Sequence, residues 1–250
     1  MKVPIRLASA LLLCAAALLA GDLTIVSKNS GKFNEGTSTQ YYSASFQRHN
    51  HEGTKTDQLT DFKAGVMYTI KHKDRKIEKM SFDDLAAAAE GMEAQMAKMK
   101  EQMANMPEFL RKTMGMDADS VSVEEVEKDT VAGRKCRVYK VVVGKLQMEL
   151  ANDPTLTLPI SPEAWARFGK LRGMAMGGGM GGYKKLYEEM SKLKGVTLRS
   201  RSTFPIVGEM VTEAVEVKEG PIPAAVFALP EGYKVEDVGK KLVEQSRKAR

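Results

Sequence analysis

The chain has 250 residues, a formal net charge of +6 and two cysteines. Its 38 Lys and Arg side chains are scattered and nearly balanced by 32 Asp and Glu, which argues against a nucleic-acid-binding surface. If an N-terminal segment containing Cys14 is cleaved, Cys136 is the only cysteine left, so no intramolecular disulfide can form. Stability must then come from a packed core.

The first 20 residues have the pattern of a secretory signal peptide. Lys2 and Arg6 give a positive start, residues 7–20 are almost wholly apolar, and polar sequence follows. The apolar run is too short to span a bilayer comfortably. We therefore predict cleavage after residue 20 and a periplasmic or secreted protein; the alternative is lipid anchoring through Cys14.

Residues 23–82 have the pattern of β-strands with short polar turns. The segment 37–49 is rich in Thr, Tyr, Ser and Phe and has no apolar face of helical period. Three short strands should follow it as an antiparallel meander, at residues 58–62, 66–72 and 76–82.

A helical insertion is predicted over residues 82–116. Ser81 and Asp84 resemble a capping box, and Pro107 should end or kink the helix. Six apolar residues at alternating spacings of four and three would share one helical face: Met92, Met96, Met99, Met103, Met106 and Leu110. Because methionine is an adaptable apolar side chain, this face is interpreted as packed core, as a lid over an apolar ligand, or as a Cu(I) thioether site.

Strands resume near residue 122 and alternate with short helices. Residues 136–143 suit a buried strand paired through Gly144 with the next one, and Ser161-Pro162-Glu163 is typical of a helix start. The remaining predicted elements are a helix at 183–193, strands at 196–204, 206–218 and 224–229, and a helix at 235–248.

Residues 173–182 form a predicted Gly- and Met-rich loop that offers a weak metal site. Met174, Met176 and Met180 could coordinate Cu(I) in a flexible loop, or the loop could be an ordinary mobile surface segment. His49 and His51 would lie on one side of a strand and could share a metal, with His72 on a neighbouring strand; the alternative is three surface histidines.

No catalytic motif is found. The glycine loop matches G-x-G-x-x-G only because it is nearly all glycine, and it follows a helix instead of the strand that a dinucleotide site requires. Cys136 lies in an apolar strand, where a thiol is inert, and nucleophile motifs such as G-x-S-x-G are absent. We therefore expect no enzyme and no cofactor.

Three segments resemble an uncharacterised bacterial envelope family. Residues 61–70 with 76–80 fit its x-M-Y-x-I strand and lysine-rich turn, residues 132–140 fit G-x-x-C-x-x-Y, and residues 222–233 fit P-x-x-x-F-x-x-P-x-G-Y. The resemblance implies a fold like that of the outer-membrane lipoprotein carriers, in which a half-barrel of antiparallel strands is closed by helices and its concave apolar face holds acyl chains. It assigns no site residue here.

Together these patterns predict a single exported α+β domain over 21–250, a curved antiparallel half-barrel covered by helices. Its expected function is non-catalytic binding or carriage of a hydrophobic molecule, such as an acyl chain, a lipid or a lipoprotein. The alternatives are a periplasmic copper-binding protein and a structural or stress-related envelope protein without a ligand. The basic C-terminal side chains indicate a solvated helix end or transient contact with an anionic membrane surface; no pattern specifies an oligomeric state.

Overall fold

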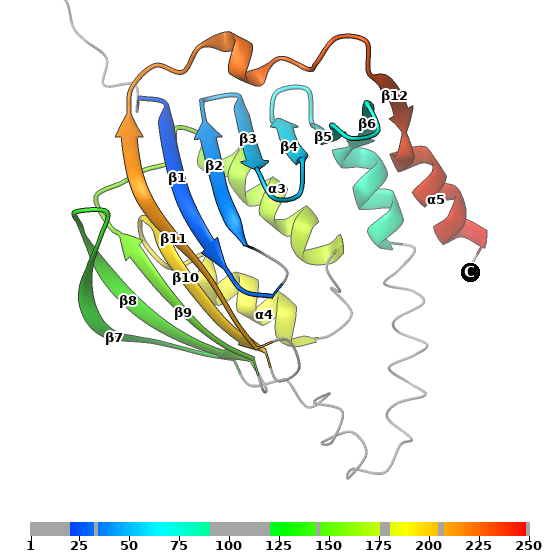
Figure 1. Ribbon diagram of the computed structural model, residues 1–250. Helices are drawn as coiled ribbons and strands as arrows, with labels where there is room; N and C mark the ends of the chain where they lie inside the picture. The colour runs from blue at the N-terminus through cyan, green and yellow to red at the C-terminus, as the bar shows by residue number, and fades with distance from the viewer. Residues whose placement is uncertain are drawn as a thin grey trace, which may run out of the picture.

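The described strands form one continuous sheet of twelve members. The computed structural model describes residues 21–32, 35–90, 121–143, 146–175, 181–204 and 208–248. The strand order is β12-β6-β5-β4-β3-β2-β1-β11-β10-β9-β8-β7 (Figure 1). The strands are β1 (Leu23–Ser30), β2 (Gly36–Tyr42), β3 (Phe46–His51), β4 (Thr56–Asp61), β5 (Val66–Lys71), β6 (Lys76–Ser81), β7 (Val121–Val131), β8 (Arg134–Val143), β9 (Leu146–Asp153), β10 (Val196–Phe204), β11 (Gly208–Glu219) and β12 (Lys234–Asp237).

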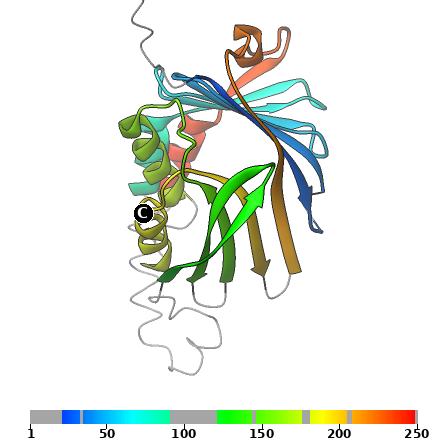
Figure 2. The ribbon, with the colours of Figure 1, turned by 90° about the vertical axis from the view of Figure 1, so that its left-hand side faces the viewer.

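The sheet is curved and unclosed, which confirms the predicted large antiparallel sheet (Figure 2). Every neighbouring pair is antiparallel except β12 and β6, which are parallel. The register shifts within β1/β11, β9/β10 and β7/β8, and such bulges bend strands and increase their twist. Strand β7 also contacts β11, and Asp129, beyond the bulge of β7, pairs with Arg199 of β10 at 2.7 Å.

Among the described residues, the α-helical segments are residues 82–90, α3 (Pro162–Ala175), α4 (Gly181–Met190) and α5 (Val238–Lys248). The two predicted helix starts are confirmed. The Ser81 hydroxyl accepts the Asp84 backbone N–H at 3.0 Å and donates to its carboxylate, and the Ser161 hydroxyl accepts the Ala164 N–H at 3.2 Å. Such caps satisfy N–H groups that lack partners in the first turn. Both α3 and α4 lie on one side of the sheet, called the inner face below (Figure 2).

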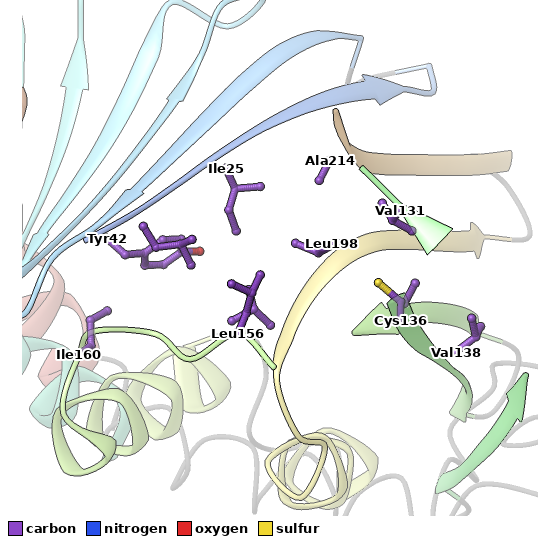
Figure 3. Packing of buried hydrophobic residues seen from close by; sticks show 12 residues of the cluster. Ile25, Tyr42, Val131, Cys136, Val138, Leu156, Ile160, Leu198 and Ala214 are labelled. Carbon is purple, nitrogen blue, oxygen red and sulfur yellow. The ribbon is translucent and has the colours of Figure 1, made fainter. Parts of the chain in front are cut away.

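The main core joins the middle of the sheet to the segment that leads into α3. Leu23, Ile25 and Tyr42 of β1 and β2 belong to one cluster with Leu198 of β10 and with Leu156 (Figure 3). A second cluster lies under α4, where Leu186 packs among buried side chains of β8 and β9. Burial of these side chains supplies the main favourable term in folding.

The outer face of β3–β6 is covered by the crossing segment, defined as residues 220–233, which connects β11 to β12 (Figure 1). Its side chains Phe227, Leu229 and Tyr233 pack against a buried group from β4, β5 and β6. That group consists of Leu59, Ile70 and Ile77. The sheet is therefore packed on both faces in this region.

In the C-terminal region one predicted element is wrong, and another begins later than predicted. The predicted strand at 224–229 is instead a 3-10 helix, η1 (Ala224–Phe227). In its first turn the Val226 N–H donates to the Pro223 carbonyl at 2.9 Å. Its Phe227 side chain packs on the outer face, while the Val226 carbonyl accepts a hydrogen bond from Arg48 instead of from a neighbouring strand. The predicted helix at 235–248 begins only at Val238, because residues 234–237 pair with β6 as β12.

Several predicted features lie outside the described residues. They are the signal peptide with Cys14, and the helical insertion beyond residue 90, including its row of methionines. Among the helices that the structure describes, none is both long and apolar enough to cross a membrane.

Candidate functional site

A cavity of about 290 Å³ lies between the inner face of β2–β4 and helix α3. It is partly open, and strands and helix contribute different chemistry to its wall. The lining side chains are Gln40, Tyr42, Gln47, His49, Gln58 and Thr60 from the sheet and Trp165 and Phe168 from α3. This volume is near the lower end of the range for small-molecule sites.

The sheet side of the cavity follows from the strand register. Gln40, His49 and Gln58 pair directly across β2, β3 and β4. The next cross-strand row on the same face holds Tyr42, Gln47 and Thr60. Because side chains alternate between the two faces of a sheet, both rows point to the inner face. Five of these six side chains end in an amide, an imidazole or an aliphatic hydroxyl, and the sixth is Tyr42.

The helix side of the cavity is aromatic. The Trp165 ring lies 5.8 Å from Phe168 and 6.5 Å from Tyr42, measured between ring centroids. Phe62 supports both helix residues from the end of β4, at 6.3 Å from Trp165 and 5.5 Å from Phe168. Edge-on and tilted contacts at these distances are favourable for aromatic rings. The Ser161 cap fixes the start of α3, so Trp165 is held one turn into a well-defined helix.

Among the described residues, only some of the cavity's polar side chains are hydrogen-bonded. The Tyr42 hydroxyl donates to the Gln40 side-chain oxygen. By contrast, in the part of the chain that the structure describes, the side-chain amides of Gln47 and Gln58 form no hydrogen bond. A primary amide offers two donors and a carbonyl acceptor, so these two side chains can bind polar groups of a guest.

The predicted histidine pair is present, but the third histidine is not near it. His49 and His51 share the inner face with ring centroids 6.5 Å apart. His72 lies on the outer face, where its Nε2 is 3.0 Å from Asp57 and its Nδ1 is 3.1 Å from the Tyr233 hydroxyl. Among the described residues, no group of three or more His, Cys, Asp or Glu side chains is arranged to hold a metal.

The methionine sites stay predictions. Met92, Met96, Met99, Met103, Met106 and Leu110, and Met176 and Met180 of the glycine loop, lie outside the described residues. Met174 lies within α3, but its side chain is not among those described.

A polar cluster on the outer face holds the crossing segment in place. The Arg48 guanidinium is 2.5 Å from Asp57 and donates to the carbonyls of Val226 and Ala228 at 2.8 and 3.1 Å. The same Asp57 carboxylate meets His72. Both Arg48 and Asp57 are about nine-tenths buried, so each ion needs the other's charge to offset its lost hydration. No local pattern in the sequence predicts this cluster, because Arg48 and its carbonyl partners are about 180 residues apart.

A second group of charges fastens β12 to the edge of the sheet. Glu236 of β12 lies 3.0 Å from Lys76 of β6 and 3.1 Å from Lys234. Hydrogen bonds from these two lysines lower the pKa of Glu236 from 4.5 to about 2. The parallel β12–β6 pairing is thus supported by charge as well as by backbone bonds.

Sequence comparison assigns no family to this chain. No family model matches it, and no curated protein matches it significantly. Among solved structures, PNGF-II is similar with a TM-score of 0.42 and 14% identity over 91% of this chain; the match spans only 34% of PNGF-II's own length. An uncharacterized conserved protein from Thermus thermophilus has a TM-score of 0.47 and 9% identity, covering 88% of this chain and 91% of that one.

Two further proteins are among the similar structures. The MucA/MucB complex of Pseudomonas aeruginosa gives a TM-score of 0.41 and 9% identity over 84% of this chain and 56% of that one. A LolA-superfamily protein from Nitrosomonas europaea gives a TM-score of 0.25 and 5% identity, covering 84% of this chain and 90% of that one. All of these TM-scores are below 0.5, so none of these likenesses carries a function to this chain.

Proposed function

We propose that this chain is an exported, non-catalytic binding protein of the bacterial envelope that holds a small ligand between α3 and the inner face of β2–β4. The cavity of about 290 Å³ is the observation that supports this function. The pattern of residues 1–20 supports export. A concave site with an apolar wall and a few converging polar groups is the usual form of a small-molecule site.

The absence of catalysis is part of the proposal and is supported by the kinds of side chain in the wall. Amides, an aliphatic hydroxyl and aromatic rings make up the lining apart from the single imidazole of His49. General acid–base catalysis needs groups that exchange protons near neutral pH, commonly two of them in different roles. A wall of this composition suits recognition through hydrogen bonds and stacking.

The cavity also changes the kind of ligand that the sequence suggested. A purely hydrophobic molecule would suit Trp165 and Phe168 but would face the amides of Gln47 and Gln58 on the opposite side. Burying such amides against a hydrocarbon without new hydrogen bonds costs about 1–3 kcal/mol each. We therefore propose a ligand that has an apolar face and also polar groups.

Native mass spectrometry of the gently purified mature protein tests this function. We expect a fixed mass increment from a co-purified molecule, and we expect the variant Gln58→Phe, which fills the cavity, to lack it. The matched control is Gln147→Phe, because Gln147 is an exposed strand residue of β9 outside the cavity. A bare protein that also shows no Trp165 emission change with sugars, fatty acids or short peptides would refute the proposal.

A further inference from the structure

We propose that the ligand of this cavity is a small neutral saccharide, with a sugar ring stacked against Trp165 and its hydroxyls bonded to the amides of Gln47 and Gln58. This inference rests on the proposed function and names the chemical class of its ligand. Three properties of the described wall support it: its charge, its hydrogen-bonding groups and its aromatic surface.

The described wall carries no permanent charge. Its eight side chains include no Lys, Arg, Asp or Glu, and its titratable members are His49 and Tyr42. An anionic headgroup, such as a fatty-acid carboxylate or a phosphate, would lose hydration here without meeting an arginine or lysine. A cationic ligand would equally lack a carboxylate partner. The described part of the wall therefore suits a neutral ligand.

The polar groups of the wall match hydroxyls. Gln47 and Gln58 lie on adjacent strands, and each is paired across the ladder with another polar residue, Gln47 with Thr60 and Gln58 with His49. Each amide can both donate and accept hydrogen bonds, as can each sugar hydroxyl. An alkyl chain would leave these groups unpaired, and sites built to hydrogen-bond a ligand discriminate strongly against analogues that lack the bonding group.

The aromatic wall supplies the other half of the recognition. Trp165 stands one turn into α3, on the opposite side of the cavity from the glutamines. A sugar ring has a rim of hydroxyls and a flat face of C–H groups, and that face can be buried on an indole. The volume of about 290 Å³ admits about one or two sugar rings, and it is small for an extended peptide.

Titration of the mature protein with chosen probes tests the ligand class. Trp165 is the only tryptophan of the chain, so its emission reports on this cavity directly, and calorimetry measures the affinity independently. The probes are maltose, cellobiose and chitobiose, with laurate and an acetylated dipeptide amide as competitors of other classes. We expect at least one disaccharide to shift the emission saturably and to release or absorb heat with the same midpoint.

Paired variants locate the binding. Gln47→Leu with Gln58→Leu keeps side-chain size but removes both amides, and we expect it to weaken disaccharide binding at least about tenfold. The control Gln147→Leu, at an exposed position of β9, should bind as the unmodified protein does. Unchanged affinity in the paired variant would overturn the assignment.

The outcomes separate the two proposals. Binding of laurate or of the dipeptide amide without any saccharide response would overturn the saccharide class and leave the binding function standing. No response to any probe, together with a bare native mass, would refute both. These titrations use the unmodified protein, so they decide the question even if the paired variant does not fold.

Discussion

Helices α3 and α4 lie over regions of different character on the inner face of the sheet. Under α4, Val141, Val143 and Leu150 form a buried apolar cluster with Leu186 of the helix. Under α3, the corresponding face of β2–β4 presents amides and a hydroxyl and encloses a cavity. Both helices lie on the same side of the sheet (Figure 2). The contact under α4 is an apolar cluster, whereas α3 combines apolar packing through Phe168 and Leu171 with a lined cavity beside it.

The cavity under α3 is compatible with a stable sheet because the same strands are packed on their other face. Strands β3–β6 do not depend on their inner face alone, because the crossing segment buries Leu59, Ile70 and Ile77 on their outer face. A buried apolar layer on one side is enough to hold an antiparallel sheet. The inner side of β3 and β4 can therefore carry polar side chains and serve binding, beside the apolar cluster that Phe62 and Met67 join under α3.

The largest expected effect is at the packed half. Leu150→Ala removes a side chain that is 4% exposed within the cluster under α4. We expect it to lower the free energy of unfolding by about 3 kcal/mol, within a range of roughly 2–5, because the loss of buried methyl groups adds to the cavity left behind. Chemical denaturation followed by circular dichroism measures this. A loss below about 1 kcal/mol would mean that the half under α4 is not tightly packed.

A smaller loss is expected at the outer face. Arg48→Met leaves the Asp57 carboxylate facing only His72 and removes the donor to two carbonyls of the crossing segment. We expect the free energy of unfolding to fall by about 2 kcal/mol, less than for a buried charge left without any partner, because His72 still contacts the Asp57 carboxylate. Hydrogen exchange should show faster exchange in residues 220–233 before any change in β8 and β9.

The control for that variant is Arg201→Met. Arg201 is half-exposed and forms longer surface pairs with Glu149 and Glu209, which contribute little to stability. If both arginine variants lost the same stability, the outer-face cluster would not be what holds the crossing segment.

Acid should loosen the end of the sheet beside β6. The pKa of Glu236 is lowered from 4.5 to about 2 by its lysine partners. A carboxylate whose pKa is lower in the folded state stabilises the fold fully above its ordinary pKa, and this contribution is lost as the pH falls from about 4.5 towards 2. We expect protection of β12 amides to fall over that interval, and Glu236→Gln to remove this step. The exposed Glu244 of α5 provides the matched control, Glu244→Gln.

Local patterns predicted the strands and helix starts well, but they could not predict the site. The alternation of side chains in residues 66–70 and the helix cap at Ser81 each depend on a few neighbouring residues, so the sequence alone predicts them. The 224–229 segment is a short apolar run between two prolines, as a strand can be, yet its Val226 and Ala228 carbonyls accept hydrogen bonds from Arg48 of a distant strand. The cavity likewise depends on the register of three strands and on Trp165 from a helix that follows them by about 100 residues.

The smallest effect on stability is expected at the cavity. It tests most directly whether the region under α3 differs from the packed region under α4. Gln58 is exposed to the cavity, and among the described residues its side-chain amide forms no hydrogen bond, so Gln58→Ala should change the free energy of unfolding by less than about 0.5 kcal/mol. In the same denaturation experiment, Leu150→Ala should lose several times more. If Gln58→Ala kept the free energy of unfolding but no longer bound the ligand, Gln58 would serve binding and not packing. A loss as large as that of Leu150→Ala would instead mean that the space under α3 is core, since only a packed side chain is that costly to truncate.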